Sequence, residues 1–206
     1  MTWPELLAGL PLVAILRGIE PAEAPEVAQA LFEGGIRCVE VTLNSPQPLQ
    51  SIAAVRARFD DRLLIGAGTV LSPHEVAGAA AAGAEFIVSP DANTAVIEAT
   101  KTAGLVSLPG VFTPTEAVAA LRTGADALKL FPAEAASPAV LKALLAVLPT
   151  GTAVLPVGGI EPAAIPSWRA SGAAGFGVGG ALYRRGRTLA DVRRRAEAFV
   201  AAWRPP

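Results

Sequence analysis

Residues 63–89 read LLIGAGTVLSPHEVAGAAAAGAEFIVS, and this stretch decides the fold. Apolar runs at 63–67 and 86–89 flank an alanine-rich stretch of helical length at 73–82. That stretch begins Ser-Pro-His-Glu, which supplies an N-cap, a proline at the first helical position and an acidic first turn, and Gly83 follows its end. The segment therefore predicts a strand, a helix and a second strand.

The same unit recurs along the whole chain. Further stretches of helical length lie at 22–32, 115–122 and 138–148, and a glycine often separates a helix from the next apolar run. Several runs are apolar throughout, which is typical of parallel strands covered by helices, although periodicity alone does not separate them from buried helix. The eight candidate strands are 12–16, 38–43, 63–67, 86–89, 105–108, 127–131, 153–157 and 175–178.

Eight such units predict a (β/α)8 TIM barrel, an α/β fold, preceded by a short helix at 3–10. Residues 1–206 are expected to form this barrel as a single domain. A doubly wound open sheet is the competing architecture. The barrel is preferred because the eight units are similar and no dinucleotide-binding fingerprint follows the first strand.

Composition limits the function classes. The chain is 52% hydrophobic and 17% charged, and its formal net charge of -1 provides no field that would attract nucleic acid or an anionic membrane. No apolar run approaches the roughly 20 residues of a membrane helix. Cys38 is the only cysteine, which excludes an internal disulfide and fits the cytoplasm. The expected partner is a small molecule.

Lys129 is the first candidate for chemistry, because active sites of such barrels lie at the carboxyl ends of the strands. Strand alternation places it on the same face as Ala127 and Phe131, toward the barrel interior. Burial lowers the pKa of an amine, which makes it a nucleophile toward carbonyl carbon. The chain has 14 arginines and only three lysines. A lysine at position 129 therefore indicates that this position needs an amine and not a guanidinium group. The alternative is a structural lysine that reaches solvent or pairs with a carboxylate.

Glu40 is the second candidate. In CVEVTLN it shares the inward face with Cys38, Thr42 and Asn44. A partly buried carboxyl group suits the proton transfers that accompany imine formation on a keto acid. The alternative role is a structural ion pair with Arg17 or Lys129.

Other strand ends carry weaker signals. Arg17 can fork onto a carboxylate, although a surface arginine is nearly as plausible. Glycine pairs follow the seventh and eighth strands, where this fold usually binds phosphate through backbone N–H groups: Gly158, Gly159, Gly179 and Gly180. His74 is the only histidine, so neither a histidine metal site nor a Ser-His triad is expected. Tyr183 and Trp168 are expected to pack in the core.

Eight phrases together make the chain resemble the 2-keto-3-deoxy-6-phosphogluconate and phosphogalactonate aldolase family. They are VAILRG, VEVTLNSP, GAGTVL, VSPD, LPGVFTPTEA, ALKLFPAE, VGGI and GVGGALY, and the resemblance runs from residue 12 to the last helix. It implies Lys129 as the Schiff-base lysine and Glu40 as general acid and base. It also implies Arg17 and Thr69 near the pyruvate carboxylate, Pro90 and Phe131 lining the site, the glycine loops as phosphate site, and a homotrimer.

Two positions bear on the substrate. Asn44-Ser45-Pro46 follows EVTL and resembles the galactonate type, whereas gluconate types tend to continue with Arg-Thr, so Asn44 joins the expected substrate-binding residues. Gly180 stands where relatives often have serine, so one hydroxyl contact to phosphate is missing.

The resulting hypothesis is a metal-free, cofactor-independent class I aldolase. It would reversibly cleave 2-dehydro-3-deoxy-6-phosphogalactonate, a phosphorylated keto-deoxy sugar acid, to pyruvate and glyceraldehyde 3-phosphate. A 2-dehydro-3-deoxy-6-phosphogluconate or 4-hydroxy-2-oxoglutarate aldolase is the nearest alternative. A phosphosugar isomerase or epimerase with Glu40 as base, and a non-catalytic phosphosugar-binding barrel, are more distant ones.

Overall fold

The structure is a computed structural model that describes residues 1–204, and strands alternate with helices along it as expected. The strands are β1 Leu12–Leu16, β2 Cys38–Thr42, β3 Leu64–Gly68, β4 Phe86–Val88, β5 Val106–Leu108, β6 Gly110–Val111, β7 Leu128–Leu130, β8 Val154–Pro156 and β9 Phe176–Val178. The α-helices are α1 Trp3–Ala8, α2 Ala24–Glu33, α3 Pro48–Phe59, α4 Pro73–Ala81, α5 Thr94–Thr102, α6 Pro114–Arg122, α7 Pro138–Leu145, α8 Ile165–Ala170 and α9 Leu189–Trp203.

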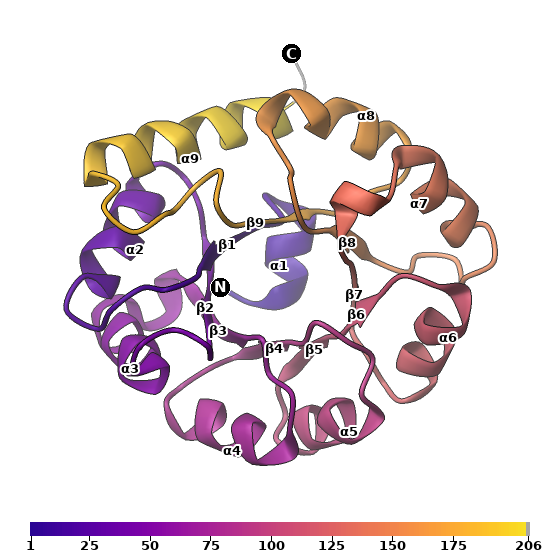
Figure 1. Cartoon of the computed structure of the whole chain (residues 1–206), viewed down its shortest axis with the longest axis horizontal. Coiled ribbons are helices and arrows are strands. Elements are labelled where there is room, and N and C mark those ends of the chain that lie inside the picture. Colours follow the sequence, from indigo (N-terminus) through magenta and orange to yellow (C-terminus); the bar gives the residue numbers. More distant parts are fainter. Residues whose placement is uncertain (205–206) are drawn as a thin grey trace.

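All strand pairs are parallel, and the strands form two curled sheets. Six strands follow the order β5-β4-β3-β2-β1-β9, and three follow the order β6-β7-β8. Figure 1 shows the strands curving around α1, with the other helices outside them. A single bridge between Val157 and Gly177 joins the end of β8 to β9. Six of the eight predicted strands form the first sheet, namely β1 to β5 and β9. This arrangement supports an α/β fold with a curled parallel sheet.

The ring of strands is interrupted between β5 and β6, a break that the sequence did not predict. Pro109 separates β5 from the two-residue strand β6, because proline has no N–H to continue a ladder of hydrogen bonds. Its carbonyl still accepts a hydrogen bond from the Lys129 backbone N–H at 2.9 Å. The region predicted as one strand at 105–108 is therefore followed by a second short strand that pairs with β7.

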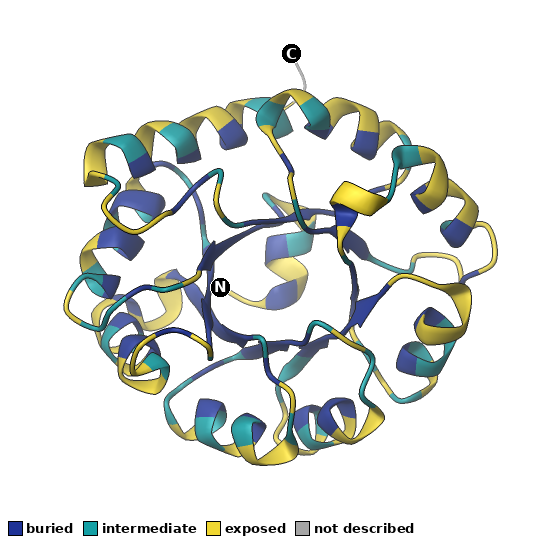
Figure 2. Ribbon diagram, viewed as in Figure 1, coloured by how far each residue is buried: buried dark blue, intermediate teal, exposed yellow. Residues whose placement is uncertain are grey.

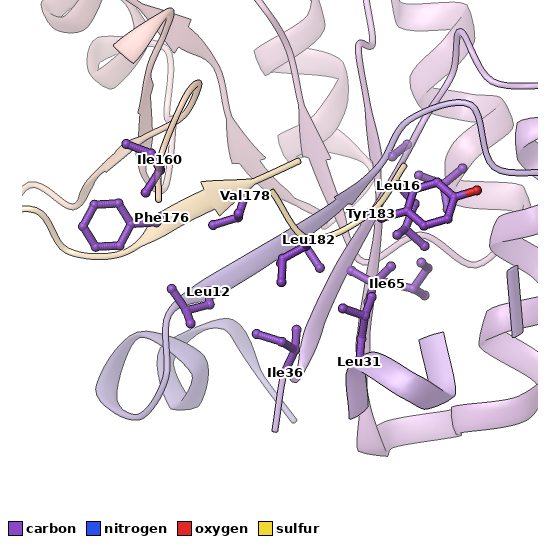
Figure 3. Packing of buried hydrophobic residues seen from close by; sticks show 14 of the residues in the cluster. Leu12, Leu16, Leu31, Ile36, Ile65, Ile160, Phe176, Val178, Leu182 and Tyr183 are labelled. Atoms are coloured by element: carbon purple, nitrogen blue, oxygen red, sulfur yellow. The ribbon is translucent and has the colours of Figure 1, made fainter. Parts of the chain in front are cut away.

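Alternation along the strands produces two separate cores. Side chains of one parity, such as Leu12, Val39 and Leu128, pack outward against the helices, and Figure 3 shows part of this layer. Side chains of the other parity form an inner cluster that contains Val13, Cys38, Leu64, Phe86, Val88, Leu108, Ala127 and Leu155. Figure 2 shows the strands buried and the surrounding helices with buried residues toward the strands and exposed residues away from them.

Helix α1 closes one end of the inner cluster. Thr2 and Glu5 form a capping box at its start, and the helix places Trp3 and Leu6 in the inner cluster. The Trp3 ring lies 6.1 Å from that of Phe86, centroid to centroid. Because several inner-cluster residues are the first residues of their strands, α1 covers the amino-terminal ends and leaves the carboxyl ends for a site. Within residues 1–204, no helix is both long and apolar enough to cross a membrane.

Candidate active site

Lys129 lies at the centre of β7, with its side chain inside the ring of strands. It has the same parity as Ala127 of the inner cluster and is only 5% exposed. Its strand neighbours are Gly110 of β6 and Leu155 of β8. The ammonium nitrogen lies 4.5 Å from the ring centroid of Phe131. The sequence argument for an inward lysine is therefore matched by the structure.

Burial lowers the pKa of Lys129 from its ordinary value. The charge of Glu40 opposes this shift, whereas the positive charge of Arg17 adds to it. A larger share of the amine is therefore neutral at a given pH than for an exposed lysine. A neutral buried amine can attack a carbonyl carbon.

Glu40 points into the same interior from β2, between Ile15 of β1 and Gly66 of β3, and is 2% exposed. Its carboxyl group lies against the backbone of β3 at Gly68, where a Cβ would come within 1.7 Å of Oε1. Glycine at position 68 therefore leaves the space that the carboxyl group occupies.

Burial raises the pKa of Glu40, while the charges of Lys129 and Arg17 lower it. None of the ion pairs found within the described part of the chain includes Glu40, Arg17 or Lys129. The structural ion pair considered for Glu40 is thus not formed here. A carboxyl group with a raised pKa stays protonated to higher pH, so it can donate a proton as well as accept one.

A cavity of about 410 Å³ lies at the carboxyl ends of the strands. It brings together six of the residues expected at the site, namely Arg17, Phe131, Gly158, Gly159, Gly179 and Gly180. Arg17 follows β1, and its side chain is exposed to the cavity mouth. Gly158 and Gly159 both have positive φ, 115° and 62°, a backbone conformation that side-chain-bearing residues rarely adopt. The two glycine loops therefore form one wall of a single cavity.

Of the other predicted residues, Thr69, Pro90 and Asn44 lie just beyond strand ends and do not line this cavity, and neither do Lys129 and Glu40 on the strands themselves. Thr69 follows β3 with φ of 58°, an uncommon conformation for a β-branched residue and one that is often found near functional sites. Pro90 follows β4, and its carbonyl lies so close to Gly110 that a Cβ there would be 2.3 Å away. Both are half-buried.

Asn44 is exposed, whereas its neighbour Ser45 is buried. The Ser45 hydroxyl accepts a hydrogen bond from the Gly18 N–H at 2.9 Å and lies 3.1 Å from the Thr42 hydroxyl. Ser45 therefore connects the loops after β1 and β2. Ser45 has this linking role, whereas the sequence had pointed to its neighbour Asn44 as the functional residue of this loop.

Four cavity residues were missed or given another role. Glu134 lines the cavity from the short 3-10 helix Ala133–Ala135, and Arg184 and Arg185 line it from the loop before α9. None of these segments has hydrophobic periodicity, so no sequence pattern pointed to them. Tyr183 is buried, as expected, and packs in the outer core (Figure 3). It also reaches the cavity, and its hydroxyl donates a hydrogen bond to Glu23 at 2.6 Å. Trp168 is buried in the same core, as expected.

Residues that could hold a metal are scattered. Across positions 1–204, no group of three or more His, Cys, Asp or Glu side chains is arranged to hold a metal ion. His74 lies in the first turn of α4, on the outer side of the strands. The groups that the site does present are an amine with a lowered pKa, a carboxyl group with a raised pKa and a guanidinium group.

Comparison with known proteins adds independent findings. The family model described as KDPG and KHG aldolase matches residues 4–192. A 2-dehydro-3-deoxy-6-phosphogalactonate aldolase of Escherichia coli strain K12 is 46% identical over 195 residues, 95% of each chain. A probable 2-dehydro-3-deoxy-6-phosphogalactonate aldolase of Rhizobium meliloti is 45% identical, covering 94% of this chain and 91% of its own. A solved structure described as native KDPGal superposes with a TM-score of 0.92 at 46% identity, covering 94% of both chains.

Proposed function

Because the chain belongs to the KDPG and KHG aldolase family, it is an aldolase and therefore a lyase, and we propose that it acts through a Schiff base on Lys129. We propose 2-dehydro-3-deoxy-6-phosphogalactonate as its substrate, with pyruvate and glyceraldehyde 3-phosphate as products. The observation that carries the mechanism is a buried amine of lowered pKa inside the same ring of strands as a buried carboxyl group of raised pKa.

The first half of the proposed reaction forms the imine. The neutral amine of Lys129 adds to C2 of the keto acid, and the proton that the nitrogen then loses passes to the former carbonyl oxygen, which gives a neutral carbinolamine. Glu40 donates a proton to the departing hydroxyl group, which leaves as water, and the iminium forms. The raised pKa of Glu40 supports this donor role.

The second half breaks the carbon–carbon bond. A base, which we assign to the Glu40 carboxylate, removes the C4 hydroxyl proton while the C3–C4 electron pair moves into the iminium. Glyceraldehyde 3-phosphate leaves, and the remaining enamine is protonated at C3. Water then hydrolyses the iminium, which releases pyruvate and restores the amine. The protonated nitrogen serves as the electron sink for the cleavage.

The remaining predicted residues are assigned to binding. Arg17 can fork onto the substrate carboxylate, and Thr69, Pro90 and Phe131 would surround the pyruvate portion. Gly158, Gly159, Gly179 and Gly180 would hold the phosphate through backbone N–H groups on one cavity wall. Asn44 would act from the exposed loop beside Ser45.

The galactonate substrate is favoured over its C4 epimer by the names of the two relatives described above, whose identity to this chain extends over nearly its full length. The gluconate epimer and 4-hydroxy-2-oxoglutarate are the competing substrates. Comparison of kcat/KM on the two phosphorylated epimers tests the choice, and an equal or higher value on the gluconate epimer would overturn it.

Three structural proposals accompany this function. The two curled sheets form one closed (β/α)8 barrel, supported by the Val157–Gly177 bridge and by the single residue, Pro109, between β5 and β6. Residues 1–204 form one domain, and the last two residues of the expected 1–206 domain lie outside the described residues. The enzyme is a homotrimer, and exposed apolar side chains such as Phe112 and Val147 support association. Sedimentation equilibrium tests the oligomer.

Borohydride trapping tests the mechanism. Reduction in the presence of pyruvate should add the mass of a reduced pyruvate adduct to the peptide that contains Lys129. Lys129→Ala should lose both the adduct and cleavage, whereas Lys142→Ala, which removes an exposed lysine of α7, should keep both. Turnover by wild-type enzyme without an adduct would instead favour the isomerase or epimerase reaction, with Lys129 as an electrostatic partner only.

A further inference from the structure

Arg184 lies in the loop between β9 and α9, which also contains Gly179 and Gly180. Its side chain is exposed and lines the cavity together with Gly158, Gly159 and Gly180. Its Nε donates a hydrogen bond to the Gly180 carbonyl at 2.9 Å, which holds the guanidinium group across this loop. The remaining N–H groups of the fork are free to face the cavity.

Glycine at position 180 makes room for this arrangement. A Cβ at Gly180 would lie 3.2 Å from Nε and 3.6 Å from Nη2 of Arg184, which is tighter than ordinary contact for the first of these atoms. A larger side chain at position 180 would therefore crowd the guanidinium group. The absence of a side chain at position 180 therefore leaves the space in which the Arg184 guanidinium group lies.

Arg184 also differs from the arginines around it in its charge environment. Arg185 pairs with Glu20, and Asp191 pairs with three arginines, namely Arg187, Arg194 and Arg195. Within residues 1–204, no carboxylate lies within ion-pair distance of Arg184. Its positive charge therefore faces the cavity without a neutralising partner.

The carboxylate of Glu134, in the short 3-10 helix Ala133–Ala135, also lines this cavity. The Glu134 side chain lies over Gly158 and Gly159, since a Cβ on Gly158 would be 2.0 Å from Oε2. Glu134 lines the same cavity as Arg184 and would repel an anion bound against the glycine loops. The positive charge of Arg184, which lines the same cavity, would offset part of that repulsion.

We propose that Arg184 binds the phosphate group of the substrate, supplying a bidentate cation where position 180 has no side chain, and that Glu134 limits the affinity of this phosphate site. The inference rests on the proposed function, because it places the phosphate end of the substrate at the glycine loops. Guanidinium is suited to the task, since its planar fork matches two phosphate oxygens.

Binding of inorganic phosphate, followed by ³¹P NMR titration, tests the inference without any turnover. Arg184→Gln should weaken phosphate binding about 10-fold, because it removes a charged donor from the site. Arg184→Lys should recover part of the loss. Glu134→Gln should tighten binding several-fold. Arg194→Gln is the matched control, because it removes an equal charge from the same end of α9 outside this cavity, and it should change binding less than twofold.

Kinetics then separate this inference from the proposed function. Arg184→Gln should raise KM for the phosphorylated substrate about 10-fold, leave KM for the same keto acid without phosphate unchanged, and leave borohydride trapping of pyruvate unchanged. Unchanged phosphate binding in Arg184→Gln, or an equal loss on both substrates, would overturn the role of Arg184. Failure of the wild-type enzyme to trap pyruvate would overturn the Schiff-base mechanism while the phosphate titration still decided the role of Arg184.

Discussion

Gly68→Ala should disable proton transfer by displacing the carboxyl group of Glu40. A Cβ at position 68 would lie 1.7 Å from Oε1 and 2.4 Å from Cδ of Glu40, whereas ordinary contact begins near 3.4 Å. The carboxyl group must therefore move by about 3.4 − 1.7 = 1.7 Å, because β3 is paired with β2 and β4 on its two sides and cannot readily withdraw. The Gly68 backbone has no positive φ, so alanine fits the strand itself.

The expected loss in kcat follows from the size of this shift. Positioned acid–base groups typically contribute about 10²–10⁴-fold, and a displacement of about 1 Å can cost about 100-fold. We therefore expect kcat to fall at least about 100-fold in a coupled assay of pyruvate release. Overpacking of this kind costs about 1–3 kcal/mol of stability, so thermal unfolding is measured in parallel.

Gly66→Ala is the matched control. It introduces the same methyl group two residues earlier in β3, where the three atoms nearest to the Cβ would all belong to the buried ring of Phe86, at 2.5 Å. It should lower the stability to a similar degree while the folded enzyme keeps kcat within a few-fold. A Gly68→Ala enzyme with near wild-type kcat, or a Gly66→Ala enzyme that loses kcat equally, would refute the assigned role of the Glu40 carboxyl group.

Three further predictions concern charge and stability. Arg17→Met should shift the pH profile of borohydride trapping at saturating pyruvate to higher pH, because the charge of Arg17 helps to lower the pKa of Lys129; an unshifted profile would contradict this coupling. Glu40→Gln should raise Tm relative to wild type increasingly as pH rises above the ordinary carboxyl pKa, since a raised folded pKa means that stability is lost as pH rises through it; parallel Tm curves would argue against it. Ser72→Ala should cost about 1 kcal/mol in urea unfolding with kcat unchanged, because it removes the α4 capping box; a loss of activity would be unexpected.

Strand parity accounts for what the sequence could predict of the site. Cys38 and Ala127 belong to the inner cluster, so Glu40 and Lys129, two residues further along each strand, had to point inward. Parity applies only within a regular strand. The sequence could therefore predict that the side chains of Glu40 on β2 and Lys129 on β7 are buried inside the ring of strands.

Beyond the ends of the strands, parity no longer applies. Asn44 belongs to the inward parity of its strand, but the chain turns after Thr42, so Asn44 is exposed and Ser45 is buried. Arg184 lies in the loop after β9 and Glu134 in the short 3-10 helix after β7, and both line one cavity only through the tertiary arrangement of β7, β8 and β9. No periodic signal marks such residues, and the surrounding arginines make position 184 look like part of a solvated basic face.

This division between strands and loops has a mechanistic consequence. Lys129 and Glu40 are held by paired neighbours on both sides, so their geometry is insulated from changes in the loops. Arg184 is held by one hydrogen bond to Gly180 of its own loop, so it can change with the residue at position 180 while the strands stay in place. Substitutions at positions 180 and 184 should therefore act on KM for phosphorylated substrates, whereas substitutions at position 68 should act on kcat. Chemistry and substrate selection can vary independently because different elements of the fold carry them.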